Sequence, residues 1–186
     1  MKFNWPNQLT MLRIALIPVF VVVFYLPYAW APPACAAIFA LAAITDWFDG
    51  WLARRWNDIS PFGEFFDPVA DKLMVTVALV LTLQTDARVI LAIPVIIIIG
   101  REITISALRE WMAALGARRR VAVTWLGKVK TATQMLAIVL LLYRYSIGMF
   151  PVYKIGLILL IVAAALTLWS MSLYLLAAWP ELSRER

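Results

Sequence analysis

The sequence contains no histidine and a single cysteine among its 186 residues. Without histidine there is no imidazole to act as general base, metal ligand or phosphate carrier, so proton transfer must use carboxylates, lysine, tyrosine or water. One cysteine, Cys35, excludes an intrachain disulfide and a thiolate metal site. Charged residues are also few, at 15%, whereas 64% of the residues are hydrophobic. A soluble domain of this size could not bury so much apolar surface, so we expect an integral membrane protein.

Apolar runs recur along the whole chain at the length that a membrane-spanning helix needs, which is roughly 20 residues. Breaks rich in proline, glycine or charge separate them. The pattern predicts an all-α, polytopic membrane protein in which residues 1–186 form a single domain, a bundle of six transmembrane helices. The predicted spans are 9–29, 34–53, 66–85, 88–112, 122–144 and 153–178. We expect the first span to be retained rather than removed as a signal peptide, because polar residues and a proline (6–8) interrupt the layout of a leader.

The basic residues lie at the ends of the apolar runs, and their distribution predicts the orientation of the chain. The formal net charge is +6. This placement suits lipid head groups, so we expect membrane lipids and no nucleic acid among the partners. If the amino terminus is cytosolic, the inner loops and ends carry Lys2, Arg54, Arg55, Arg118, Arg119, Arg120, Arg184 and Arg186. The outer ends carry only Arg88, Arg144 and Lys154. The excess of inner cations predicts that both termini are cytosolic.

Four aspartates interrupt the apolar pattern within 26 residues, at the end of the second predicted span and the start of the third. Asp46 and Asp49 are three residues apart, and Asp67 and Asp71 are four apart. These spacings place each pair on one face of a helix. The break between the spans turns the chain back, so the two pairs can face each other. Ionised carboxylates in such a place are costly and repel one another, which argues against a purely structural role.

Two arrangements would relieve this repulsion. Some carboxylates can be protonated, as in a proton or ion pathway, or divalent cations can lie among them. Aspartates without histidine or thiolate neighbours favour hard ions such as Mg²⁺ or Mn²⁺. Two such ions leave coordination positions for the phosphate oxygens of a phosphoryl transfer. Nearby, the small Gly50 and Ala53 let a ligand approach closely, and Arg54 suits a diphosphate. Taken singly, each of these three also fits ordinary helix packing or an interface anchor.

The segment DWFDGWLARRWNDISPFGEFFDPVAD, residues 46–71, has the form D-x2-D-G-x2-A-R-x8-G-x3-D-x3-D. It resembles the signature of the CDP-alcohol phosphotransferases, integral membrane enzymes of phospholipid synthesis, and departs from it at no fixed position. The segments NQLTMLR, GREITISALREWMA and GKVKTATQM extend the resemblance to nearly the whole chain. They are most similar to bacterial members that transfer a phosphatidyl group from CDP-diacylglycerol to glycerol 3-phosphate and release CMP.

The resemblance implies a fold, a set of ligands and a site. Members of the family have six transmembrane helices, usually form homodimers, and bind two divalent ions that hold the diphosphate of the CDP-linked donor. The implied ligands of two Mg²⁺ or Mn²⁺ ions are Asp46, Asp49, Asp67 and Asp71. The implied CDP-binding residues are Gly50, Ala53, Arg54 and Gly63. Asp71 would also deprotonate the acceptor hydroxyl as the catalytic residue. A bacterial member would lie in the inner membrane, with its active site on the cytosolic side.

The phosphate of the acceptor would need cations beyond those that serve the donor. Arg101 and Arg109 are eight residues apart, a little over two helical turns, so they lie near one face of the fourth span. Two lysines stand at the cytosolic start of the fifth span. The candidate ligands of the acceptor phosphate are therefore Arg101, Arg109, Lys128 and Lys130. For the arginines, salt bridges to Glu102 or Glu110 are the alternative interpretation. Thr10 and Arg13, near the amino terminus, either approach the site or anchor the chain at the interface.

Three other functions stay open at this point. An ion-coupled transporter would spread its carboxylates through the depth of the membrane and show inverted repeats, whereas these cluster near one side and no internal repeat is evident. A polyprenyl-diphosphate transferase would carry aspartate motifs of different spacing, and two of them. Within the resembled family, inositol phosphate or a second lipid would also suit a cationic acceptor site.

Overall fold

The computed structural model describes residues 5–56, 61–114 and 125–182. These ranges form six α-helices, and within them the only β-type pairing is an isolated bridge between Ile147 and Phe150. The helices are α1 (Trp5–Phe24), α2 (Ala31–Trp56), α3 (Pro61–Thr85), α4 (Val89–Ala114), α5 (Trp125–Tyr143) and α6 (Val152–Leu182). Each overlaps one predicted span, so the predicted all-α architecture of six helices is confirmed.

Two boundary errors reach five residues: α3 begins at Pro61 where we predicted residue 66, and the first span was predicted to reach residue 29. Helix α1 instead ends at Phe24. Pro27 explains the difference, because a proline lacks the backbone N–H that a helix needs and disfavours helical geometry in the residue before it. Two further prolines, Pro32 and Pro33, stand in the first turn of α2, where no backbone N–H is required.

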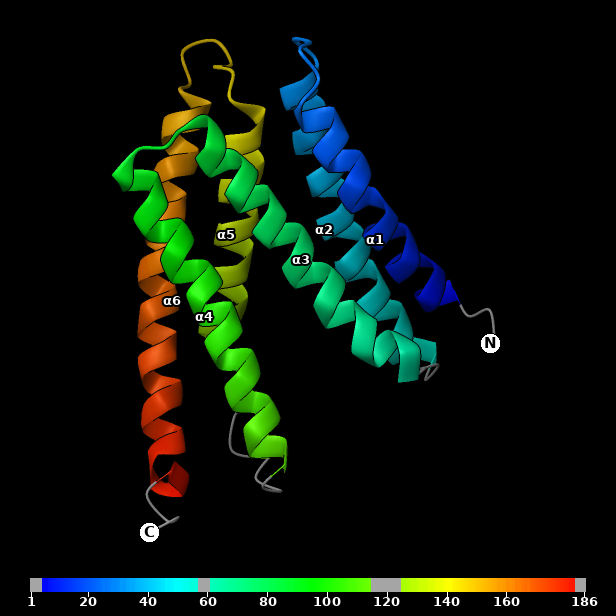
Figure 1. Ribbon diagram of the computed structural model, residues 1–186, viewed down its shortest axis with the longest axis vertical. Helices are drawn as coiled ribbons and strands as arrows, with labels where there is room; N and C mark the ends of the chain where they lie inside the picture. The colour runs from blue at the N-terminus through cyan, green and yellow to red at the C-terminus, as the bar shows by residue number, and fades with distance from the viewer. Residues whose placement is uncertain (1–4, 57–60, 115–124, 183–186) are drawn as a thin grey trace.

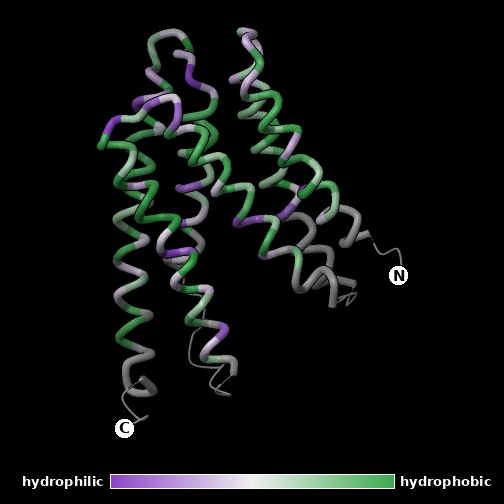
Figure 2. Tube along the Cα trace, viewed as in Figure 1, coloured by the Kyte–Doolittle hydropathy of each residue, from purple (hydrophilic) through white to green (hydrophobic). Residues whose placement is uncertain are grey.

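The apolar stretches of the helices differ in length. Three are long and apolar enough to cross a membrane: Pro68–Thr85 of α3, Val89–Met112 of α4 and Val152–Leu173 of α6. Among the described residues, the apolar stretches of the other three helices are shorter, at Thr10–Phe24, Ala31–Asp46 and Val129–Tyr143. In α2 the stretch ends at the first of the four aspartates. Figure 2 shows mostly green helices, with purple segments in the lower halves of α3 and α4.

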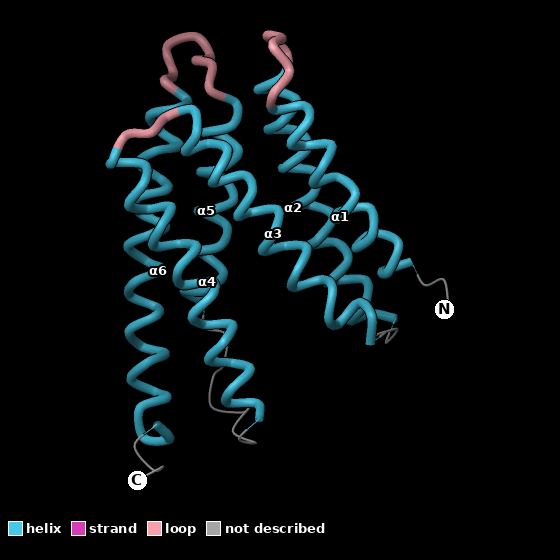
Figure 3. Tube along the Cα trace, viewed as in Figure 1, coloured by secondary structure: helices cyan, strands magenta, loops and turns pink. Residues whose placement is uncertain are grey.

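The helices run alternately up and down. In Figure 1, α1 runs upward from its first turn and α6 runs downward to its last turn, and the connections 25–30, 86–88 and 144–151 lie at the upper end, where Figure 3 shows them in pink. Helix α1 packs against α2 and α3, α5 packs against α2 and α6, and α4 packs against α6. Short connections favour this antiparallel arrangement of neighbouring helices. The aspartate-bearing ends of α2 and α3 therefore lie toward the same end of the bundle as the start of α1 and the end of α6.

Apolar side chains fill the space between the helices and also cover much of the outside. Phe20, Phe39 and Ile138 are buried, whereas Ile96 and Leu176 are two of many large apolar side chains that are exposed. Such an exterior suits a bilayer, where helices pack by close van der Waals contact. Gly156 illustrates this between α5 and α6, because a Cβ added there would stand 3.0 Å from the Cβ of Leu140.

A polar cluster joins the α3–α4 turn to α6 at the upper end of the bundle. Arg88 donates from Nε to Oδ1 of Asp86 at 2.7 Å and from Nη2 to Oδ2 at 2.6 Å. The hydroxyl of Tyr153, on α6, donates to the same carboxylate. The hydrogen bonds from Arg88 contribute most to holding the pKa of Asp86 well below its ordinary value, and the bond from Tyr153 acts in the same direction.

We expect Asp86→Asn to lower the thermal stability at neutral pH and to flatten its dependence on acid pH. A carboxyl whose pKa is depressed in the folded state stabilises the protein above its unfolded pKa, about 3.9. That stability is lost as the pH falls from there through the folded-state value. Thermal unfolding in detergent from pH 7 to pH 3 should show a gap of a few degrees between wild type and variant that narrows below about pH 4. A gap that stays constant across this range would contradict the expectation.

Candidate active site

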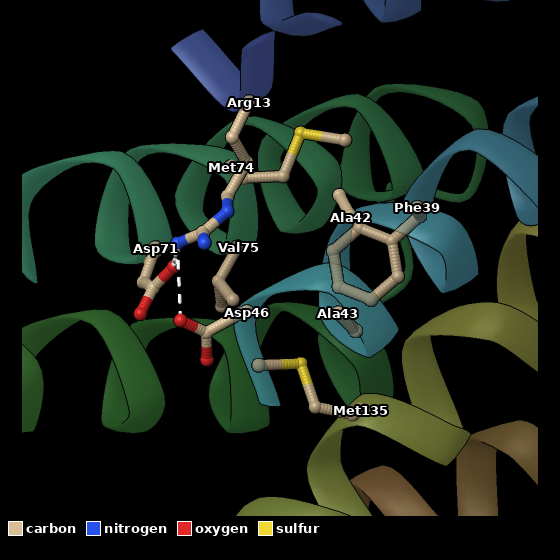
Figure 4. Close-up of a pocket in the computed structure, with 9 residues that line it drawn as sticks. All are labelled: Arg13, Phe39, Ala42, Ala43, Asp46, Asp71, Met74, Val75 and Met135. Carbon is tan, nitrogen blue, oxygen red and sulfur yellow. Dashed lines mark hydrogen bonds and ion pairs between the residues drawn. The ribbon is translucent and has the colours of Figure 1, made fainter. Parts of the chain in front are cut away.

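Helices α1, α2 and α3 each contribute one charged side chain to a single cluster. Arg13 donates from Nη1 to Oδ1 of Asp46 at 3.0 Å, and the same nitrogen donates to Oδ1 of Asp71. The side chain of Arg13 is only 2% exposed, whereas Asp46 and Asp71 are 41% and 32% exposed. Figure 4 shows the guanidinium group reaching from α1 to the two carboxylates. The structure thus brings together one member of each aspartate pair that the sequence singles out.

Arg13 was not among the predicted site residues, and the alternative that it anchors the chain at the interface is wrong. Thr10 and Arg13 are both buried and stand three residues apart on one face of α1, the helix that contacts both α2 and α3. The sequence carried one signal for this role. An arginine within an apolar run is costly without an internal partner, and the aspartates supplied that partner.

A small, partly open pocket of about 20 Å³ lies beside this cluster. Its charged end is formed by Arg13, Asp46 and Asp71. Its remaining lining is apolar and comes from Phe39, Ala42, Ala43, Met74, Val75 and Met135. The two alanines stand about one turn before Asp46 on α2, where their small side chains leave room. A charged end joined to an apolar wall suits a ligand with a charged head and an apolar remainder.

The donor set of the cluster fits a hard divalent cation. Carboxylate oxygens from two helices converge on one cationic group, and Mg²⁺ and Mn²⁺ prefer such oxygen ligands. Within the described part of the chain, no group of three or more carboxylate or thiol side chains gathers in one place. Asp49 and Asp67 lie on the same two helices, α2 and α3, but their side chains are outside the described residues.

Several other predicted site residues also have side chains outside the described residues. Those expected to bind CDP are on α2 and α3, and two of the expected acceptor ligands are on α4 and α5. They are Gly50, Ala53, Arg54, Gly63, Arg109 and Lys128.

A second polar cluster joins α3, α4 and α5. Lys72 donates from Nζ to Oγ of Ser106 at 2.5 Å, and Ser106 donates to the backbone oxygen of Glu102 at 2.6 Å. Oε1 of Glu102 lies 2.8 Å from Nη1 of Arg101 and 3.9 Å from Nζ of Lys130. Arg101 and Lys130 are nearly buried, with side chains 11% and 4% exposed. Two of the predicted acceptor ligands therefore meet at one carboxylate.

This second cluster is connected to the first. Lys72 directly follows Asp71 in α3, so one peptide bond separates a member of each cluster. The amino group of Lys72 binds Ser106 on α4. Arg101 pairs with Glu102, the partner that the alternative interpretation of this arginine named. Two cations contact the Glu102 carboxylate, and Lys72 is linked to Glu102 only through Ser106.

The chain belongs to the CDP-alcohol phosphatidyltransferase family, whose sequence model matches residues 3–169. Members of this family generally use divalent metal ions. The present chain is 57% identical to a protein of Salmonella paratyphi A and 55% identical to one of Escherichia coli (strain K12). Each comparison extends over 182 residues, which is 98% of both chains. Both are named CDP-diacylglycerol–glycerol-3-phosphate 3-phosphatidyltransferase. The family resemblance that residues 46–71 indicated is confirmed.

Proposed function

We propose that this protein transfers a phosphatidyl group from CDP-diacylglycerol to glycerol 3-phosphate, giving phosphatidylglycerophosphate and CMP in phospholipid synthesis. Relatives that carry the name of this activity are 55–57% identical over nearly the whole chain. The main structural support is the convergence of Asp46 and Asp71 at the charged end of a pocket with an apolar wall. The pocket itself is small, at about 20 Å³, so the support lies in the placement of two carboxylates beside an apolar wall and not in its size.

The four aspartates of the signature are our proposed ligands for two Mg²⁺ or Mn²⁺ ions, with Asp46 and Asp71 facing each other and Asp49 and Asp67 on the same helices. Bound ions would supply positive charge for the diphosphate of the donor and for the phosphorus under attack. The nucleotide would lie along the segment that contains Gly50, Ala53, Arg54 and Gly63.

The side chains of the protein then have distinct tasks. Asp71 takes the proton of the acceptor hydroxyl, because its carboxylate lines the pocket and is an oxygen base in a chain without histidine. The hydroxyl oxygen forms a bond to the phosphorus of the phosphatidyl group, and the bond from that phosphorus to the CMP oxygen breaks, so CMP leaves with the electron pair. Arg13 holds Asp46 and Asp71 in position. Arg101 and Lys130 bind the phosphate of the acceptor.

A panel of acceptors tests this proposal. The purified protein is incubated with CDP-diacylglycerol, Mg²⁺ and, separately, glycerol 3-phosphate, inositol phosphate, serine and choline. We expect CMP release with glycerol 3-phosphate alone, and mass spectrometry should identify the lipid as phosphatidylglycerophosphate. A lipid product from another acceptor would overturn the assigned acceptor while keeping the family. Movement of substrate across sealed vesicles without CMP formation would instead favour a transporter.

We also propose that the protein lies in the bacterial inner membrane as a homodimer, with both termini and the site on the cytosolic side. Helix α1 begins and α6 ends toward the same side of the bundle in Figure 1, and this placement and the excess of basic residues in the inner loops support the orientation. Met149, in the α5–α6 connection, is 98% exposed, and Cys35 is buried. A Met149→Cys variant should therefore react with a membrane-impermeant maleimide added outside intact cells or spheroplasts. Labelling only after the membrane is opened would contradict the orientation.

A further inference from the structure

Glu102 occupies the centre of the second polar cluster. Its carboxylate contacts Arg101 from its own helix and Lys130 from α5, and its backbone oxygen accepts from Ser106, which in turn binds Lys72 of α3. Glu102 is the one acidic residue among these described contacts. Two cations that are each about nine-tenths buried or more thus share a contact with this carboxylate, Arg101 at 2.8 Å and Lys130 at 3.9 Å.

We propose that Glu102 is a positioning residue for the acceptor: it holds the cationic groups of Arg101 and Lys130 side by side, ready to bind the phosphate of glycerol 3-phosphate. This inference rests on the proposed function. Glu102 does not contact the reacting atoms; it acts through the two cations. Long basic side chains otherwise lose considerable conformational freedom when they bind a ligand, and a binding site that is already ordered avoids that cost.

The cluster has unused capacity for an anion. Nε of Arg101 is buried and finds no hydrogen-bond partner among the described residues, a state that is costly for a charged group. Glu102 brings one negative charge to the two cations, Arg101 and Lys130, that contact its carboxylate. A phosphate monoester has several acceptor oxygens and up to two negative charges, so it can accept from the guanidinium and balance the remaining charge.

The position of the cluster fits a molecule that reaches Asp71 with its hydroxyl. Lys72 is adjacent to Asp71 in sequence. Met135 lines the pocket beside Asp71 and follows Lys130 by five residues on α5, which is about 7.5 Å along the helix axis. Helices α3 and α5 therefore each contribute residues both to the pocket beside Asp71 and to the second polar cluster.

Two effects of Glu102 on phosphate binding oppose each other. Its negative charge repels a phosphate, but that charge is already offset by two cations in contact with it. When the carboxylate of Glu102 is removed, the side chains of Arg101 and Lys130 are no longer held in place and must be ordered when the phosphate binds. We expect the second effect to win, with a rise in KM for glycerol 3-phosphate of about tenfold in Glu102→Gln.

The experiment compares variants in steady-state kinetics with each substrate varied in turn. In Glu102→Gln the KM for glycerol 3-phosphate should rise, while the KM for CDP-diacylglycerol should stay within about twofold. Inorganic phosphate, tested as a competitor of the acceptor, should inhibit the variant less, in proportion to the change in KM. Glu102→Asp keeps the negative charge, so its KM for glycerol 3-phosphate should lie between those of the wild type and Glu102→Gln. The matched control is Glu110→Gln, an exposed glutamate about 12 Å further along α4, which should leave both constants unchanged.

Several outcomes would overturn the inference. A purely structural role for Glu102 would lower kcat and the thermal stability without separating the two KM values. An unchanged inhibition by inorganic phosphate would show that Glu102 acts on another part of the acceptor. A lower KM for glycerol 3-phosphate would show that repulsion wins. All of these require a wild type that is active with glycerol 3-phosphate; its inactivity with that acceptor would be a failure of the proposed function and not of Glu102.

Discussion

Asp71→Asn should reduce CMP release on the order of 10³-fold while leaving the protein folded. Asparagine cannot take a proton from the acceptor hydroxyl, and it offers a cation a neutral oxygen in place of a charged one. The size of Asp71 is retained, and its side chain is one-third exposed, so the packing of α3 should hold. The measurement is CMP release by purified variant and wild type at equal concentration, with thermal unfolding as the test of folding.

The matched control for this variant is Asp86→Asn, the same substitution at the other end of the bundle. Asp86 binds Arg88 and Tyr153 and lies in the connection between α3 and α4. The Asp86→Asn protein should lose some thermal stability but keep its activity. A folded Asp71→Asn protein with more than about a tenth of wild-type activity would show that Asp71 has no essential part in the chemistry.

Arg13→Ala should be among the most destabilising single substitutions in the chain. It removes a buried cation that contacts both Asp46 and Asp71. Breaking a buried pair in this way costs about 3–5 kcal/mol, and the partial exposure of both carboxylates reduces the expected loss to about 2–3 kcal/mol. The measurement is thermal unfolding in detergent, in the presence of a chelator. Lys154→Ala, which removes an exposed cation from α6, should have little effect.

Divalent ions should partly restore the stability of Arg13→Ala. An ion bound between the carboxylates supplies positive charge that the arginine no longer provides, and binding to the folded state alone stabilises it. We therefore expect Mg²⁺ or Mn²⁺ to raise the unfolding temperature of Arg13→Ala more than that of the wild type. Arg13→Lys keeps the positive charge and should lose less thermal stability than Arg13→Ala. An equal effect of the ions on all three proteins would contradict the assignment of Asp46 and Asp71 as metal ligands.

The fold was largely predictable because apolar runs of membrane length dominate the sequence. Six runs separated by polar breaks became six helices, and one of the two five-residue boundary errors arose at Pro27, where a local effect outweighed hydropathy. The spacing of the aspartates likewise indicated a site, since positions three or four residues apart share a helical face.

The contacts that complete the site were not predictable in the same way. Arg13 meets Asp46 and Asp71 across separations of 33 and 58 residues, and the packing of α1 against α2 and α3 determines that meeting. Spacing along α4 indicated that Arg101 shares a face with another arginine. It did not decide between a carboxylate and a substrate as the partner of Arg101, and the Lys130–Glu102 contact exists only once α4 and α5 are in place.

The most direct test of metal-dependent phosphatidyl transfer is the stoichiometry of the two products before and after removal of divalent ions. Purified protein is supplied with CDP-diacylglycerol and glycerol 3-phosphate, treated with a chelator, and then given back Mg²⁺ or Mn²⁺. We predict equal amounts of CMP and phosphatidylglycerophosphate, none of either with the chelator, and recovery of both when the ion returns. CMP without the phospholipid, or formation of both products in the chelated sample, would contradict the account.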